Sequence, residues 1–356
     1  MKRFVIKVGS NVLTRDDGKL DITRLSAIVD QIVWLKRHDI EIILVSSGAV
    51  AGGRDELKID RKLGSVAQRQ LFSAIGQVKL MGLYYDLFRE YGIHVGQILT
   101  MKESFSTRRE YLNQRSCMNT MLKNDVIPIV NENDTVSVTE LMFTDNDELA
   151  GLVASMINAD TLIILSNVDG IYNGSPDSPK ATVIPSIHYD HDINRYILDE
   201  KSSFGRGGMI TKCNIARKVA EEGIRVIIAN GKTDNILIKL YECPREAIYT
   251  EFVPNSNAVS NVKKWIAHSE SFAKGAVVVN RQAAETLKNN RAASLLLVGV
   301  TDIRGEFEEG DIINIVEEHG SVIAIGRSSY SSKEAMTHLG RHDMKPIVHY
   351  DYLYVE

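Results

Sequence analysis

The sequence contains few cysteines and no closely spaced cysteine pair. Among its 356 residues there are three, Cys117, Cys213 and Cys243, and none belongs to a Cys-x-x-Cys pair. An odd number of widely separated cysteines argues against a disulfide framework and favours a reducing compartment. We therefore expect the three thiols to be interior residues.

Long hydrophobic runs are also missing. No apolar stretch approaches the roughly 20 residues that a membrane-spanning helix needs. The opening residues MKRFVIKVGS do not resemble a secretory signal, because Lys7 and Gly9 interrupt the apolar run. These two absences predict a cytoplasmic protein without a membrane span.

A large net charge and a Walker A loop are absent as well. The net charge is −4, so no overall attraction to nucleic acid or membranes is expected. The pattern GxxxxGK[ST] does not occur, which argues against a P-loop kinase. The composition is that of a globular protein, and the length suits two domains better than one.

Residues 1–254 alternate between apolar strands and amphipathic helices. Runs such as EIILVSSG, VIPIVNEN and TLIILSN are rich in Val, Ile and Leu, as is typical of strands covered on both faces. The helical segment ITRLSAIVDQIVWLKRH has apolar residues at helical spacing. We predict an α/β fold in which helices cover both faces of a mainly parallel sheet.

Polar or glycine-rich segments follow four of the predicted strands. These segments are KVGSN, VSSGAVAGG, NEND and SNVDG. Ligands of open α/β sheets bind beyond the carboxyl ends of the strands. The sequence therefore predicts one binding site at this edge of the sheet.

Three segments carry groups suited to an anion. Lys7 could neutralise phosphate oxygens, or simply extend into solvent. The segment Ser46 to Gly53 offers hydroxyls and open backbone N–H groups, although its small residues would also suit close packing. The glycine loop after Ser203 leads into a helix with Lys212 in its first turn, which makes it the strongest phosphate candidate.

Two clusters, NEND and TDND, crowd carboxylates and amides between apolar stretches. Carboxylates can hold the ammonium group of an amino acid, or position lysines and Mg²⁺. The amides of Asn131, Asn133 and Asn146 can donate to a carboxylate. Alone, each cluster would be interpreted as a solvated loop. The segment His188–Asp192, HYDHD, has a His-x-x-His pair with acidic residues, so a metal site is possible there, but a solvated loop is the favoured interpretation.

The pattern changes after residue 254. Residues 255–273 are polar without a clear period and are predicted to form a linker. From residue 274 the short β-like runs GAVVVN, SLLLVGV, DIINIVEE and SVIAIGR are separated by turn residues. We predict a domain over 1–254, a linker over 255–273 and a small, mostly β domain over 274–356.

Taken in order, these segments resemble the glutamate 5-kinase family of the amino acid kinase superfamily. The resemblance is carried by KVGSNVLT, VSSGAVAGGR, YGIHVGQILT, VIPIVNENDTV, TDNDELAGLVA and GRGGMITKCNIARKVAEEG. The C-terminal runs are similar to a PUA domain. The resemblance covers essentially the whole chain and implies a three-layer αβα sandwich around a mainly parallel eight-stranded sheet, followed by a PUA-like domain.

The resemblance also implies a reaction. ATP would phosphorylate the side-chain carboxylate of L-glutamate to L-glutamyl 5-phosphate, the first step of proline biosynthesis, with Mg²⁺ as cofactor. Family members are commonly inhibited by proline and form homodimers or homotetramers. Because an acyl phosphate hydrolyses readily, a glutamyl phosphate reductase is a reasonable partner.

Site residues follow from the same resemblance. It implies that Lys7 and Lys212 contact the migrating phosphoryl group and that Asp147 orients them. Glutamate would be held by Ser47, Asp134 and Asn146. ATP would be held by Lys7, Ser166, Asn167, Arg206, Gly207, Gly208, Met209, Ile210, Thr211 and Lys212, and the metal ligands are unknown. The nucleotide contacts are open at Ser166, Asn167, Arg206 and Ile210, where the sequence departs from the family pattern.

Two alternatives remain. An acetylglutamate kinase, aspartokinase or uridylate kinase would share the sheet and the lysines but differ in the acceptor site. An RNA-binding protein is the alternative from another class, because PUA domains often bind RNA. Residues 267–356 carry 9 basic and 13 acidic residues, which argues against a basic RNA-binding face and favours a structural or regulatory role.

Overall fold

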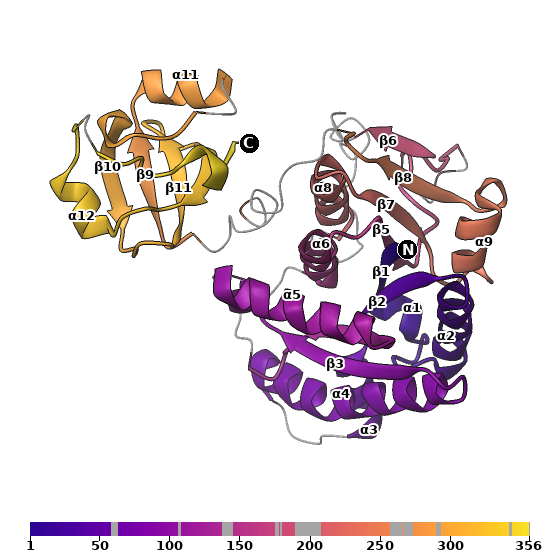
Figure 1. The fold of residues 1–356 in the computed structure, drawn as a ribbon. Helices are drawn as coiled ribbons and strands as arrows, with labels where there is room; N and C mark the ends of the chain where they lie inside the picture. The colour runs from indigo at the N-terminus through magenta and orange to yellow at the C-terminus, as the bar shows by residue number, and fades with distance from the viewer. Residues whose placement is uncertain are drawn as a thin grey trace. The chain divides into compact units, whose positions relative to one another are not determined.

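The computed structural model describes residues 1–57, 63–105, 108–136, 145–174, 178, 180–188, 208–256, 266, 273–289, 293–341 and 344–355 (Figure 1). The chain divides into two compact units. The first comprises Met1–Lys102 and Gln114–Ala258, and the second comprises Glu103–Asn113 and Val259–Glu356. No pattern in the sequence indicates that Glu103–Asn113 groups with the C-terminal residues. The limits predicted at 254 and 274 stay a prediction.

An eight-stranded sheet forms the centre of the first unit. Its order is β3-β4-β2-β1-β5-β7-β8-β6. Among its strand pairs in the described part of the chain, β7 and β8 run antiparallel and the others are parallel. This confirms the predicted α/β class with a mainly parallel sheet. The strands are β1 Lys2–Val8, β2 Ile40–Ser46, β3 His94–Thr100, β4 Val126–Glu132, β5 Thr161–Ser166, β6 Ser186–His188, β7 Arg225–Asn230 and β8 Tyr249–Val253.

Helices pack on both faces of this sheet. The helices α2, α4 and α9 share one core cluster with β1, β2 and β4, whereas α6 and α8 pack together against β1 and β7 (Figure 1). The helices of this part of the chain are α1 Ser10–Leu13, α2 Ile22–Lys36, α3 Ala49–Glu56, α4 Ser65–Arg89, α5 Arg108–Lys123, α6 Asn146–Ile157, α8 Gly208–Glu221 and α9 Ile236–Glu242. Two 3₁₀ turns, Lys102–Phe105 and Pro244–Glu246, complete the connections.

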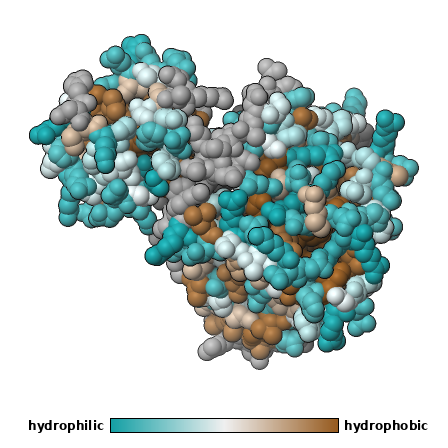
Figure 2. Space-filling model, in the orientation of Figure 1, coloured by the Kyte–Doolittle hydropathy of each residue, from teal (hydrophilic) through white to brown (hydrophobic). Residues whose placement is uncertain are grey.

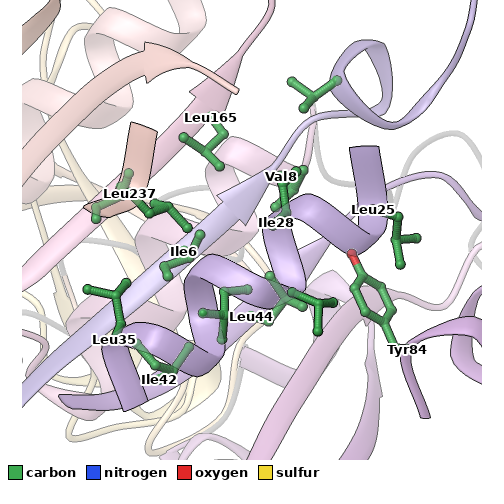
Figure 3. Close-up of a cluster of buried hydrophobic side chains, with 14 of the residues drawn as sticks. Ile6, Val8, Leu25, Ile28, Leu35, Ile42, Leu44, Tyr84, Leu165 and Leu237 are labelled. Atoms are coloured by element: carbon green, nitrogen blue, oxygen red, sulfur yellow. The ribbon is translucent and has the colours of Figure 1, made fainter. Parts of the chain in front are cut away.

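Alternation along β1 separates the two layers. Successive side chains of a strand point to opposite faces. Ile6 and Val8 lie in the cluster shared with α2 and α9, as Figure 3 shows beside Leu44 and Leu237. Lys7, between them, must point to the opposite face, on which α6 packs.

Helix α2 illustrates why the sequence folds this way. Its first turn is capped by the Asp21 carboxylate, which accepts a hydrogen bond of 3.0 Å from the backbone N–H of Arg24. The apolar face predicted from the spacing is buried as a whole. Its members are Leu25, Ile28, Val29, Ile32 and Val33.

The second unit contains a five-stranded sheet with its own core. The order is β10-β9-β11-β12-β13. Its core brings together residues such as Val277, Leu297 and Ile315. The elements are β9 Gly275–Val279, α11 Arg281–Asn289, β10 Val300–Gly305, β11 Ile312–Glu317, β12 Val322–Arg327, α12 Ser332–Thr337 and β13 Leu353–Val355, with 3₁₀ turns at Leu297–Gly299 and Tyr350–Tyr352.

The strand predicted for SLLLVGV is wrong over most of its length. Leu297–Gly299 forms a 3₁₀ turn, closed by a 3.0 Å hydrogen bond from the N–H of Gly299 to the carbonyl of Leu296. Strand β10 begins only at Val300. The apolar run was real, since Leu297 is buried, but the turn places it in the core without extended backbone.

The prediction of interior cysteines is wrong for two of the three. Cys213 is buried on α8, whereas Cys117 on α5 and Cys243 after α9 are exposed, and all three are free thiols. Burial raises the pKa of the Cys213 thiol to about 12. The sequence alone could not show that Cys117 lies on the solvent face of its helix.

Most of the face drawn in Figure 2 is hydrophilic, with smaller hydrophobic areas between. None of the helices in the described part of the chain combines the length and apolarity that crossing a bilayer requires.

Candidate active site

A carboxylate bridges two lysines beyond the carboxyl end of β1. The Lys7 ammonium lies 2.6 Å from one oxygen of Asp147, and the Lys212 ammonium donates to the other. Lys7, Asp147 and Lys212 are 7%, 1% and 8% exposed. Strand β1 and helices α6 and α8 therefore bring together three side chains that are far apart in the sequence.

Glycine at position 9 leaves room for the Lys7 head group. Gly9 follows β1, and its N–H donates to the carbonyl of Leu165 on β5 over 3.1 Å. A Cβ there would lie 3.3 Å from that carbonyl oxygen and 3.4 Å from the Lys7 nitrogen. The strand end is therefore packed closely against both its neighbour and the ammonium group.

The first turn of α6 holds Asp147 in place. The carboxylate of Asp145 caps the helix by accepting from the N–H groups of Asp147 and Glu148, at 2.9 and 3.2 Å. The positive end of the helix dipole also favours a carboxylate at this position. The Asp145 cap and the helix dipole therefore both favour the position of the Asp147 carboxylate.

Burial and neighbouring charges oppose each other in this cluster. Burial alone would raise the pKa of the Asp147 carboxyl, but Lys7 and Lys212 outweigh it and hold that pKa below its usual range. Desolvation lowers the pKa of Lys7, against the attraction of Asp147. Burial, together with repulsion from Asp147, raises the pKa of Asp145.

A polar cavity of about 510 Å³ opens beside the cluster. It is lined by the three residues expected to hold glutamate, Ser47, Asp134 and Asn146. Two arginines that the sequence reasoning did not single out, Arg54 and Arg69, line it as well. The cavity thus offers both signs of charge, as a zwitterionic ligand requires.

Hydrogen bonds connect the strand ends around this cavity. The side-chain NH₂ of Asn146 donates to the Ser47 hydroxyl over 2.8 Å and to the Asn131 carbonyl over 3.0 Å. The NH₂ of Asn131 in turn donates to Gln77 of α4 over 2.9 Å. Residues of β4, α4 and α6 therefore form one network with Ser47, which directly follows β2.

Asp134 is held by an arginine. Arg69 of α4 donates to the Asp134 carboxylate through Nε over 3.0 Å, and its terminal nitrogen pairs with the same oxygen. Glu132 lies 3.4 Å from that terminal nitrogen. The Asp134 carboxylate is therefore positioned before any substrate arrives.

The residues expected to hold a nucleotide lie at the ends of β5 and α8. Ser166 closes β5 and its hydroxyl donates to Asn167 over 3.4 Å. Helix α8 begins at Gly208, and Ile210 in its first turn is 48% exposed. Met209 and Thr211 also belong to this turn, whereas Arg206 and Gly207 lie outside the described residues.

The sequence of Ser46 to Gly53 suits either an anion-binding turn or close packing of small residues, and the two halves of the segment differ in the structure. Ser47 and Gly48 line the cavity. Gly53, within α3, packs against α4 so closely that a Cβ would lie 1.9 Å from the Phe72 carbonyl oxygen. At Gly53 the small residue therefore serves close packing, and the anion nest is not formed there.

The histidine pair adds no metal site to the described structure. His188 ends β6, and the rest of the segment lies outside the described residues. Across the part of the chain that the structure describes, no three His, Cys, Asp or Glu side chains come together as a metal site.

Known proteins match this chain from end to end. Residues 2–230 match the amino acid kinase family model, and residues 275–350 match the PUA domain model. The glutamate 5-kinase of Bacteroides thetaiotaomicron is 61% identical over 354 residues, covering 99% of this chain and 98% of that protein. Those of Chlorobaculum tepidum and Caldanaerobacter subterraneus are 44% and 38% identical, covering 99% and 98% of this chain and 97% and 94% of theirs.

Proposed function

The chain belongs to the glutamate 5-kinase family of amino acid kinases, and we propose that it transfers the γ-phosphoryl group of ATP to the side-chain carboxylate of L-glutamate. The products are L-glutamyl 5-phosphate and ADP, and the reaction is the first step of proline biosynthesis. The observation that carries the proposal is the buried Lys7–Asp147–Lys212 cluster beside a polar cavity.

The chemistry requires charge compensation more than proton transfer. A carboxylate is already ionised and nucleophilic at neutral pH, so no general base is needed. The obstacle is the approach of one anion to another. Preorganised ammonium groups remove it by stabilising the charge on the transferring phosphoryl oxygens, which is the main source of catalysis in such reactions. Lys7 and Lys212 supply these groups.

Asp147 acts as a positioning residue. Each of its oxygens is engaged by one lysine, and its lowered pKa keeps it ionised at neutral pH. It therefore fixes the spacing of the two ammonium groups and reduces their mutual repulsion. Without it, two like charges would be buried together.

Glutamate occupies the cavity with its side-chain carboxylate towards the lysines. Ser47, Asp134 and Asn146 hold the amino acid end, assisted by the arginines of the cavity wall. Recognition of both an ammonium and a carboxylate distinguishes an amino acid from acceptors without the ammonium group. Proline shares those two groups, which supports inhibition by binding at the same site.

ATP binds across the ends of β1 and β5 and the start of α8. Ser166, Asn167 and the residues from Gly208 to Lys212 lie there, and Arg206 and Gly207 precede them in the chain. The described residues form no carboxylate cage for Mg²⁺, because both oxygens of Asp147 are taken by lysines. We expect Mg²⁺ to enter as the counter-ion of the nucleotide substrate.

A hydroxamate assay tests the proposal. Hydroxylamine traps an acyl phosphate, so product should form only with both ATP and glutamate present, and proline should suppress it. ADP release with N-acetylglutamate, aspartate and UMP as acceptors tests the related kinases. Faster turnover of any of these than of glutamate would contradict the proposal.

Partners and assembly follow from the family and stay proposals. A homodimer or homotetramer is expected, and light scattering would measure it.

Because the acyl phosphate is labile, a glutamyl phosphate reductase is the expected next enzyme, and absence of channelling in a coupled assay would count against it. The excess of acidic residues in 267–356 argues against the RNA-binding alternative.

A further inference from the structure

We propose that Gln77 of α4 is a positioning residue for substrate recognition. It accepts from the Asn131 NH₂ and so helps to hold the amide orientation that decides which atoms of Asn146 and Ser47 face the ligand. The inference rests on the proposed function and specifies how the substrate ammonium is recognised. It starts from the hydrogen-bond network that links α4, β4, α6 and β2 around the cavity.

A backbone N–H sets the direction of this network. The N–H of Glu132 lies 2.9 Å from the side-chain oxygen of Asn131. A backbone N–H can only donate, so the oxygen of that amide must face it. The NH₂ of Asn131 is then directed to the Gln77 side-chain oxygen, 2.9 Å away. Asn131 is only 3% exposed, so it depends on these partners.

The orientation of Asn131 determines that of Asn146. The Asn131 oxygen lies 3.0 Å from the Asn146 side chain, which must therefore donate to it through its NH₂. The same NH₂ donates to the Ser47 hydroxyl at 2.8 Å, so both of its hydrogens are used. The carbonyl oxygen of Asn146 is therefore the atom left for a ligand in the cavity, and the proton of Ser47 is left to donate.

The Asn146 oxygen and the Ser47 hydroxyl suit the α-ammonium and the α-carboxylate of an amino acid. The Asn146 oxygen accepts from the α-ammonium of glutamate, and the Ser47 hydroxyl donates to a carboxylate. A reversed network would offer the opposite pair and would repel the ammonium. Ligand discrimination thus depends on the orientation of the Asn131 amide, which Gln77 helps to hold.

Helix α4 is built to hold both strand ends. Ser46 and Asn131 lie two residues after Leu44 and Ile129, which belong to the core cluster shared with α4. Alternation therefore directs both polar side chains towards α4. Gln77 meets Asn131, and Tyr84, two helical turns later, pairs with Ser46 at 2.8 Å.

Calorimetric titration of glutamate and glutarate tests the inference. Glutarate keeps both carboxylates of glutamate but lacks the ammonium. Gln77→Leu removes the acceptor for the buried NH₂ of Asn131, whereas Gln77→Glu keeps one. Leaving a buried donor unpaired typically costs about 1–3 kcal/mol. In Gln77→Leu this penalty falls on the Asn131 orientation that the ligand needs, so we expect glutamate binding to weaken by up to roughly 5- to 150-fold.

The pattern across variants separates positioning from general damage. Glutarate affinity should change less than glutamate affinity in Gln77→Leu, and Gln77→Glu should bind both ligands much as the wild type does. Gln282→Leu, on α11 of the second unit, is the matched control. Urea unfolding of each variant shows whether the fold is retained.

Several results would overturn the inference. Equal glutamate affinity in wild type and Gln77→Leu would do so, as would equal losses for glutamate and glutarate. Failure of Gln77→Glu to restore binding would also contradict it. Binding is measured without turnover, so a wild type that binds glutamate but does not phosphorylate it would refute the proposed function alone. A wild type that binds no glutamate would refute both.

Discussion

At the scale of residues, the site is a buried cluster of charges that depend on one another. Removing one partner of a buried ion pair leaves the other charge uncompensated, which is more costly than losing an exposed pair. Asp147 faces two lysines, so each lysine variant leaves one pair intact, while loss of Asp147 breaks both. We therefore expect loss of Asp147 to lower stability more than loss of either lysine does.

Lys7→Ala or Lys212→Ala should lower kcat by roughly 10²–10³, the usual effect of removing one preorganised electrostatic donor. The affinity for glutamate should change much less, because neither lysine lies at the amino acid end of the cavity. Steady-state kinetics with the hydroxamate assay measures both. Lys2→Ala, at an exposed position of β1, is the control. Near-normal turnover in either site variant would contradict the assigned role.

Asp147→Asn should stay folded at neutral pH, with strongly reduced kcat and lower stability. Folding lowers the pKa of the Asp147 carboxyl below its unfolded value of about 3.9. The resulting stabilisation is present above that value and is lost as the pH falls through the folded pKa. Urea unfolding between pH 7 and pH 3 should therefore show the difference between the two proteins shrinking below about pH 4.

An unchanged stability difference across that range would show that Asp147 acts by packing. An unfolded Asp147→Asn protein at pH 7 would point to a mainly structural role.

Local patterns predicted where the polar strand ends lie, but not how they pair. Lys7 and Lys212 were identified from a strand end and a glycine loop, and the structure brings both to Asp147. Arg69 was missed because nothing in SVAQRQLF indicates a partner 65 residues away at Asp134. Gln77 was missed for the same reason. The catalytic and binding roles themselves stay predictions.

At the scale of elements, α4 links the cavity to the packing of the first unit. One part of the helix lines the cavity through Ser65, Gln68 and Arg69. A second part packs against α3 at Gly76, where an added Cβ would lie 1.7 Å from the Ala49 carbonyl oxygen. Close contact of two backbones therefore sets the position of the cavity wall.

Gly76→Ala and Gly82→Ala should change stability in opposite directions. Both glycines lie in α4, but a Cβ at Gly82 has nothing within 4 Å. Alanine at position 82 should stabilise the helix by about 0.5–1 kcal/mol. Alanine at position 76 forces α3 and α4 apart, and overpacking of this kind costs about 1–3 kcal/mol or more.

Urea midpoints of the two variants and the wild type measure these effects. A stable Gly76→Ala protein with unchanged glutamate affinity would show that the α3–α4 contact does not set the cavity wall.

Elements were predicted well where long-range structure reinforces a local period. Central strands such as β5 and β7 are continuous apolar runs because helices cover both faces of the sheet there. The short helices α3, α9, α11 and α12 were not foreseen, since a helix of six to nine residues depends on tertiary contacts more than on its own propensity. The 3₁₀ turn in SLLLVGV is a further case of this kind.

At the scale of the whole molecule, the chain passes between its two units more than once. Helix α5 begins in the segment Glu103–Asn113 of the second unit and ends in the first unit. Within that segment Phe105 and Tyr111 are 0% and 2% exposed. The sheet of the first unit therefore does not by itself account for every residue before position 254.

A chain ending at residue 254 should be less soluble and less stable than the whole protein. It lacks the residues that form one unit with Glu103–Asn113, so we expect Phe105 and Tyr111, which are buried in the whole chain, to become more exposed. Replacing both aromatic residues by glutamine should restore solubility to the shortened chain, although not its full stability. Sedimentation and thermal unfolding measure the two effects. A shortened chain as stable as the full protein would instead support the domain limit predicted at residue 254.

The split composition of the second unit has a consequence during synthesis on the ribosome. Residues 103–113 leave the exit tunnel long before residue 259 is translated. At about 5–20 residues per second, the delay is on the order of ten seconds or more. During that interval this segment lacks the residues that complete its unit, so we expect the nascent polypeptide to be prone to aggregation there and to benefit from a chaperone.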